Sequence, residues 1–256
     1  MSGKLKKRLK KNALLMCKLN EEINGNERQS AFIFSNVSMS FYQPSFAEVI
    51  KNPDWVKRIN KKHTHFKDGT LEMQSSNSSD AILMNIFCNP SISMNDSLKK
   101  YLDIKISNSQ RDIVFGWNPE FENESNKKPT EIDMKIGNHI FEAKLTENSF
   151  TKKNVDVLMK YPLINEIFFF KKIEVNQNKQ VKNYQLFRNI ITAYKYNFKF
   201  TILIDETRLD LIKEINNVKE IIKDEDLKAR INFMTWQGIV KAFDNEFKNF
   251  MKTKYF

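Results

Sequence analysis

The segment 131–145 constrains the fold most, because two runs of alternating apolar and polar residues meet there at a tight turn. Ile132, Met134 and Ile136 alternate with charged residues, which is the period of a half-buried strand. Gly137-Asn138 separates this run from a second one of the same period. Because glycine readily takes the positive φ of a two-residue turn, Gly-Asn between such runs predicts a β-hairpin.

The register of this hairpin places two acids face to face. With the two-residue loop, Asp133 lies opposite Glu142, and Glu131 lies opposite Lys144. Directly opposed side chains have Cβ atoms about 4.5–5.5 Å apart, where like charges destabilise a sheet. An unfavourable local arrangement, such as two opposed acids with no visible compensating interaction, tends to mark a functional site. Lys144 points the same way as Glu142, since residues two apart on a strand share a face.

A divalent cation would explain the opposed acids. Two carboxylates with a gap between them form a hard, oxygen-rich site that suits Mg²⁺ or Mn²⁺. We therefore interpret Asp133 and Glu142 as metal ligands, with the carbonyl oxygen of Ala143 as a third. The alternative is a solvated hairpin face whose charges are incidental, and the residues alone leave both interpretations open.

Positive charge is concentrated at the start of the chain. The 256 residues carry 42 basic and 31 acidic side chains, for a net charge of +11. The first dozen residues contain no acid and hold the basic residues Lys4, Lys6, Lys7, Arg8, Lys10 and Lys11. This segment is either a phosphate-binding element or a disordered solubilising arm. We expect residues 1–20 to form a basic N-terminal extension and residues 21–256 to form a single domain.

Composition argues against several classes of protein. No run of about 18 apolar residues is present, so we expect neither a membrane span nor a membrane partner. The apolar stretch 13–17 is too short for a secretory signal, and Cys17 and Cys88 give no disulfide framework, so a cytoplasmic location is expected. With 6 glycines and no glycine-rich phosphate loop, a nucleotide-binding fold is disfavoured.

The order of the remaining elements predicts the fold class. Helices are expected within 75–90, from Asn95 or Asp96 onward, and within 183–197, 208–222 and 237–252. Strands are expected within 111–117, 198–206 and 231–236, and the continuous apolar run in 198–206 is typical of a buried parallel strand. Helices alternating with strands around a hairpin predict an α/β fold with a mixed sheet flanked by helices.

The hairpin also resembles a known family motif. Pro129-Thr130-Glu131-Ile132-Asp133, followed by Glu142-Ala143-Lys144, resembles the PD-(D/E)xK motif of the restriction-endonuclease-like superfamily. The segments 75–90, 184–194, 200–212 and 233–240 are similar to those of a bacterial subgroup, so the resemblance covers roughly residues 70 to 240. Pro129 stands four residues before Asp133 instead of adjacent to it, which departs from the motif. The resemblance implies a restriction-endonuclease-like core.

The resemblance further implies a metal-dependent endonuclease that hydrolyses DNA phosphodiester bonds, in restriction, defence or DNA processing. Asp133 and Glu142 would hold Mg²⁺ or Mn²⁺. Lys144 would orient the attacking water or stabilise the developing negative charge. The expected partner is DNA, most simply duplex DNA, and a homodimer is compatible with this function.

Other site residues follow from the same resemblance. Many members carry a further acid on the helix before the hairpin, for which Asp80 and Glu72 are the candidates. Asp80 otherwise reads as a charge that stabilises a helix N-terminus. Related nucleases often place a Gln on the helix after the second motif strand, where Gln185 stands, and Arg188 shares its helix face. For Gln185 and Arg188 the alternative is an exposed helix surface.

Two other classes of function stay open. A catalytically inactive nucleic-acid-binding module of the same fold would bind DNA without turnover. A protein-interaction component of a larger defence system would use the scaffold without a metal. The presence of Asp133, Glu142 and Lys144 together favours the enzyme.

Overall fold

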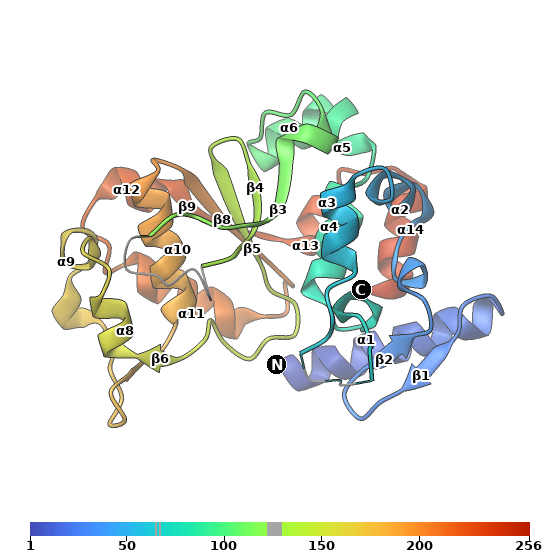
Figure 1. Cartoon of the computed structure of the whole chain (residues 1–256), viewed down its shortest axis with the longest axis horizontal. Coiled ribbons are helices and arrows are strands. Elements are labelled where there is room, and N and C mark those ends of the chain that lie inside the picture. The colour runs from blue at the N-terminus through green and yellow to red at the C-terminus, as the bar shows by residue number, and fades with distance from the viewer. Residues whose placement is uncertain (65, 67, 122–129) are drawn as a thin grey trace.

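A five-stranded mixed sheet forms the centre of the chain in the computed structural model, which describes residues 1–64, 66, 68–121 and 130–256 (Figure 1). The strand order is β3-β4-β5-β8-β9. The antiparallel part consists of β3 (Ile113–Trp117), β4 (Ile132–Ile136) and β5 (His139–Ala143). Two parallel neighbours follow β5, namely β8 (Lys199–Ile204) and β9 (Ile231–Thr235). The predicted α/β fold with a mixed sheet is confirmed.

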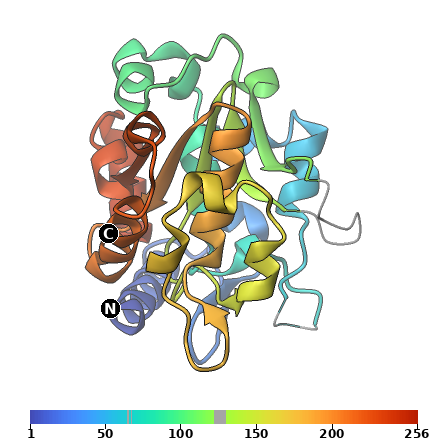
Figure 2. The same cartoon turned by 90° about the vertical axis from the view of Figure 1, so that its left-hand side faces the viewer.

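Helices cover both faces of this sheet. The helices packed on one face through a shared hydrophobic core are α1 (Ser2–Leu19), α2 (Gln43–Val49), α3 (Pro53–Ile59), α4 (Ser79–Phe87), α5 (Ser91–Met94), α6 (Asp96–Leu102), α13 (Trp236–Val240) and α14 (Asn245–Lys254). The opposite face is covered by α8 (Val155–Met159), α9 (Ile164–Ile167), α10 (Tyr184–Lys195), α11 (Leu209–Lys219) and α12 (Glu225–Arg230). Figure 2 looks onto this second group, with α10 in front of the sheet.

Short elements connect these layers. They are α7 (Ser109–Asp112), the strand pair β1 (Gly25–Glu27) and β2 (Phe32–Phe34), the pair β6 (Lys153–Asn154) and β7 (Gln180–Val181), and the 3₁₀ turns η1 (Val37–Ser40), η2 (Glu72–Gln74) and η3 (Phe170–Lys172). Across the described ranges, no helix combines the length and the apolar character needed to cross a membrane.

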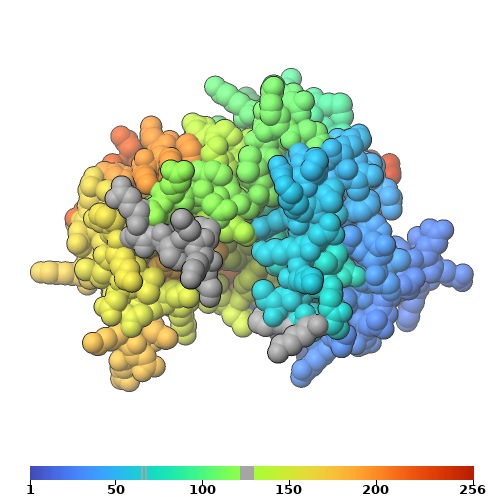
Figure 3. Space-filling view, viewed as in Figure 1, coloured from blue at the N-terminus to red at the C-terminus, as the bar shows by residue number. Residues whose placement is uncertain are grey.

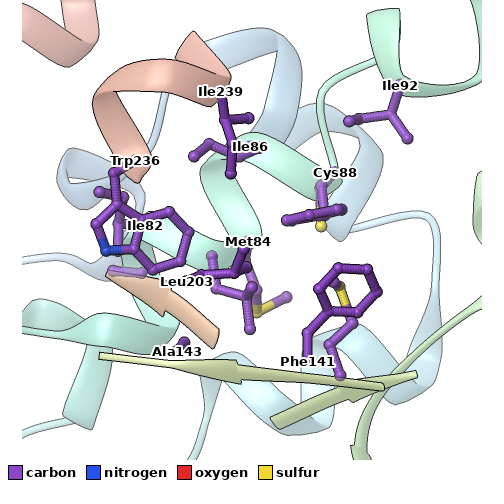
Figure 4. Close-up of a cluster of buried hydrophobic side chains, with 14 of the residues drawn as sticks. Ile82, Met84, Ile86, Cys88, Ile92, Phe141, Ala143, Leu203, Trp236 and Ile239 are labelled. Atoms are coloured by element: carbon purple, nitrogen blue, oxygen red, sulfur yellow. The ribbon is translucent and has the colours of Figure 1, made fainter. Parts of the chain in front are cut away.

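Strand β5 is buried on both faces, which decides where its polar side chains lie. Phe141 and Ala143 face the core of α4 and α13, together with Leu203 and Trp236 (Figure 4). Ile140 packs into the other core, against α10. Because all five residues of β5 are buried, an acid on this strand lies inside the protein and not on a solvated face.

Helix boundaries follow the capping residues of the sequence in most places. The Oγ of Ser78 accepts a hydrogen bond from the N–H of Ala81 at the start of α4, and Asn95 caps α6 in the same way. The single closing helix expected within 237–252 is wrong, because the chain breaks after Val240 and restarts as α14. There Asp244 caps the new helix by accepting a hydrogen bond from the N–H of Phe247, at 2.8 Å.

The basic N-terminal segment is an ordered helix. Leu5, Leu9, Ala13 and Met16 are buried on one face of α1, which packs against α14. The disordered-arm interpretation is therefore wrong. Leu5 and Leu9 belong to the same core as α4 and β5. The division into an extension of residues 1–20 and a domain of residues 21–256 stays a prediction.

Candidate active site

The hairpin has the predicted register. Met134 pairs with Phe141 and Ile136 pairs with His139, and continuing this pairing places Asp133 opposite Glu142. Gly137 supplies the positive φ of the turn, at +55°. Pro129, the first residue of the motif, lies outside the described residues.

Glu142 is fully buried and its charge is compensated. Its Oε1 accepts hydrogen bonds from Lys144 Nζ at 2.6 Å and from Gln185 Nε2 at 2.5 Å. Its Oε2 accepts a hydrogen bond from Asn189 Nδ2 at 2.8 Å. Gln185 and Asn189 come from α10, one turn apart, so this helix fixes both oxygens of the carboxylate.

Asp133 is the more accessible member of the pair. Its side chain is 19% exposed, and its Oδ2 accepts a hydrogen bond from the N–H of Ala143 at 2.8 Å. Its Oδ1 lies 4.0 Å from the Arg58 guanidinium. Burial, followed by repulsion from Glu142 and Asp80, raises the pKa of Asp133 well above its usual range. Negative charge at Asp133 is thus only partly compensated by the protein.

Lys144 is held in place by its backbone as well as by its charge. Its N–H donates to the carbonyl of Leu203, and its own carbonyl accepts a hydrogen bond from Trp236 Nε1 at 3.0 Å. The side chain is nearly buried. Burial alone would lower the pKa of Lys144, but the neighbouring carboxylates, Glu142 foremost, outweigh burial and raise it. Lys144 therefore stays an ammonium ion.

Arg58 of α3 is a site neighbour that sequence reasoning missed. Its guanidinium contacts Glu131 Oε1 at 2.6 Å and Asp80 at 2.9 Å. The opposition of Glu131 and Lys144 stays a prediction, because β4 begins at Ile132 and β5 ends at Ala143, and the Glu131 carboxylate itself contacts Arg58. Gly116 has a φ of +66° and leaves room for Arg58, because a Cβ there would lie 2.8 Å from its Nη1.

The structure brings Asp80 toward the site, whereas Glu72 lies further out. Asp80 lies in the first turn of α4 and pairs with Arg58, and its charge contributes to the raised pKa of Asp133. Glu72 pairs with Lys61 at 3.5 Å, and burial raises its pKa. Both interpretations of Asp80, as a helix-terminal charge and as a site carboxylate, thus fit its position.

Arg188 contacts the backbone of the hairpin. Its Nη2 donates to the backbone carbonyl of Glu131 at 3.1 Å, and its Nε donates to Asn189 Oδ1 at 3.2 Å. Asn189, four residues after Gln185 on one helix face, could have been found from that spacing. Arg58 gave no such signal, because its contacts depend on the tertiary fold.

Comparison with known proteins identifies the family. The family model described as Restriction Endonuclease associating with ARP, REase-ARP, matches residues 8–256. The chain belongs to the REase-ARP family. The description of this family names a restriction-endonuclease-type nuclease, for which DNA is the substrate. No match was found among the curated proteins or among the solved structures.

Two carboxylates are the candidate metal ligands of this REase-ARP member. Within the described ranges, no three His, Cys, Asp or Glu side chains are grouped as metal ligands. Asp133 and Glu142 provide two carboxylates, and the electrostatic repulsion at Asp133 is the kind that a bound cation relieves. Mg²⁺ keeps several waters and takes few protein ligands, and at Glu142 it would compete with the donors Lys144, Gln185 and Asn189.

The raised pKa of Asp133 predicts a pH dependence of stability. The folded state binds more protons than the unfolded state between the ordinary aspartate pKa, about 3.9, and the raised one. Stability contributed by this site therefore falls as pH rises through that window. We expect Asp133→Asn, in EDTA, to match the parent at low pH and to exceed its stability at neutral pH, as measured by urea unfolding.

Asp112→Asn is the matched control, because its expected effect on stability at neutral pH has the opposite sign. The backbone N–H of Asn108 and other donors lower the pKa of Asp112 to about 2. Its carboxylate thus stabilises the fold above the ordinary aspartate pKa, and its removal should weaken the protein at neutral pH. Loss of stability in Asp133→Asn at neutral pH would contradict the electrostatic account of the hairpin.

Proposed function

We propose that this REase-ARP member is a metal-dependent endonuclease that hydrolyses DNA phosphodiester bonds with a PD-(D/E)xK site. The observation that carries the proposal is the opposition of Asp133 and Glu142 on adjacent antiparallel strands, with the Lys144 ammonium 2.6 Å from Glu142. This arrangement keeps the Asp133 carboxylate next to a second carboxylate with only part of its charge compensated, at a cost that folding alone would not select.

Asp133 and Glu142 would hold Mg²⁺ or Mn²⁺, with the carbonyl of Ala143 as a further oxygen ligand. When bound, such a cation lowers the pKa of a coordinated water and neutralises charge on the scissile phosphate. The protein's own side chains would orient the carboxylates and supply positive charge.

Gln185 and Asn189 fix the orientation of Glu142, because each oxygen of that carboxylate has its own amide donor from α10. Lys144 orients the attacking water or stabilises negative charge as it develops on the phosphate. Arg58 holds Asp80 and Glu131 beside the hairpin. Gln185, Asn189 and Arg58 stand on helices and Lys144 directly follows β5, and such elements position a site more accurately than loops do.

A binding module without turnover is the second candidate function. The observation that favours it is the buried ion pair itself, because Lys144 already neutralises the carboxylate that a metal would need. Such a protein would bind DNA through its positive charge and would not cleave it.

Cleavage of plasmid DNA separates the two candidates. The purified protein is incubated with supercoiled and linear DNA in Mg²⁺, Mn²⁺ or EDTA. The enzyme predicts nicked or linear products with metal and none in EDTA. Intact DNA under all three conditions, together with salt-dependent DNA binding, would establish the binding module instead.

A further inference from the structure

Helix α1 presents a basic face, interrupted by the exposed Leu15 between Lys11 and Lys18. Lys4, Lys7, Lys11 and Lys18 are exposed, and their spacing places them along one side of the helix. The buried residues Leu5, Leu9, Ala13 and Met16 occupy the opposite side. The helix contains no acidic residue, so nothing within it offsets this charge.

The charges of these four lysines are not paired with acids in the described part of the chain, whereas their helix neighbours form ion pairs. Arg8 pairs with Asp205 at 2.7 Å and Lys10 pairs with Glu27 at 2.6 Å, on the two flanks of the helix. The flanking cations thus anchor α1, and the exposed lysines are left to solvent. In Figure 3 the blue N-terminal residues lie along the lower right of the molecule.

Helix α1 is hydrogen-bonded to the segment that follows Lys144. Ser2 Oγ donates to the carbonyl of Thr146 at 2.7 Å, two residues after Lys144. Asp205, the partner of Arg8, directly follows β8, which pairs with the catalytic strand β5. Lys6 lines a cavity of about 450 Å³ that Thr146 and Glu147 also line. Figure 1 places the N-terminus below the sheet, between the two groups of helices.

We propose that the exposed face of α1, formed by Lys4, Lys7, Lys11 and Lys18, binds the phosphate backbone of duplex DNA, with the N-terminal end of the helix next to the segment that follows Lys144. This inference rests on the proposed function and adds the surface that holds the substrate. A helix rises about 1.5 Å per residue, so Lys4 and Lys11 are about 10 Å apart along its axis. Duplex DNA carries one negative charge per about 1.7 Å, so such a row of lysines meets several phosphates. Contacts of this kind position DNA without reading its sequence.

Charge removal on α1 tests the proposal directly. The triple variant Lys4→Gln, Lys7→Gln, Lys11→Gln leaves the buried face of the helix unchanged. Deleting residues 1–12 would instead remove Leu5 and Leu9 from the core. A matched control, Lys100→Gln, Lys105→Gln, Lys213→Gln, removes the same charge from exposed positions away from α1. Binding of a labelled duplex is measured in EDTA over a range of salt, with circular dichroism as the check of folding.

We expect the plot of the logarithm of the DNA-binding constant against the logarithm of salt concentration to become shallower in the α1 variant. Its slope should change by about 2.7, since each of the three lost phosphate contacts contributes about 0.9. The control variant should keep the parental slope. Equal slopes in the two variants, or no DNA binding by the parent, would overturn the proposal. Because binding is measured without metal, a parent that binds through α1 but never cleaves would refute the nuclease function and leave this surface standing.

Discussion

Replacing Lys144 with alanine is expected to cost about 3–5 kcal/mol of folding free energy and to reduce DNA cleavage by about 10²–10³-fold. The stability loss arises because Glu142 is fully buried, and removing Lys144 leaves an uncompensated charge in the interior. The activity loss arises because Lys144 is assigned to charge that develops in the transition state. Urea unfolding and initial rates of plasmid nicking measure the two effects.

A double variant separates stability from catalysis. Glu142→Gln combined with Lys144→Met removes both charges of the pair, and replacing a whole buried ion pair is far cheaper than breaking it. The double variant should recover most of the stability and none of the activity, while DNA affinity stays within a few-fold of the parent. Parental cleavage rates in Lys144→Ala would remove this residue from the mechanism.

Trp236→Ala is expected to lower stability by about 3–5 kcal/mol, because a large buried ring is replaced by a cavity. Trp236 is fully buried in the core that also contains Ala143 and Leu203, on one face of the sheet (Figure 4). The variant also leaves the carbonyl of Lys144 without its indole donor. Chemical denaturation measures the loss.

Phe233→Ala on the neighbouring strand β9 is the control, since this ring is 36% exposed. It should change stability by about 1 kcal/mol at most. A loss of similar size in both variants would mean that Trp236 does not hold the strands of the site in place.

The hairpin was predictable because its geometry is local. A two-residue loop fixes the register, and the register alone places Asp133 opposite Glu142. Alternating and continuous apolar runs likewise predicted the strands of the central sheet, because period and burial are recorded in neighbouring residues. Gln185 contacts Glu142, at the helix position that the family resemblance implied.

Contacts between distant segments were not predictable. Arg58 precedes Glu131 by more than seventy residues, and its room beside the hairpin depends on Gly116. The compensation of Glu142 by a buried ion pair was also missed, since the sequence indicated a half-solvated strand and the helices bury it completely. The basic N-terminal segment could be placed only once its apolar face was seen to pack against α14.

Thermal melting of the parent and of Asp133→Asn, in EDTA and in millimolar Mg²⁺ or Mn²⁺, tests the paired-carboxylate metal site most directly. A ligand that binds only the folded state stabilises it by about 2.7 kcal/mol at a hundred times its Kd. We therefore expect metal to raise the Tm of the parent, and Asp133→Asn to lose most of that rise.

Glu131→Gln is the matched control, because Glu131 is paired with Arg58 and is not assigned to the metal. It should keep the parental shift in Tm. If metal raises the Tm of Asp133→Asn as much as that of the parent, or raises neither, then Asp133 and Glu142 are not a metal site.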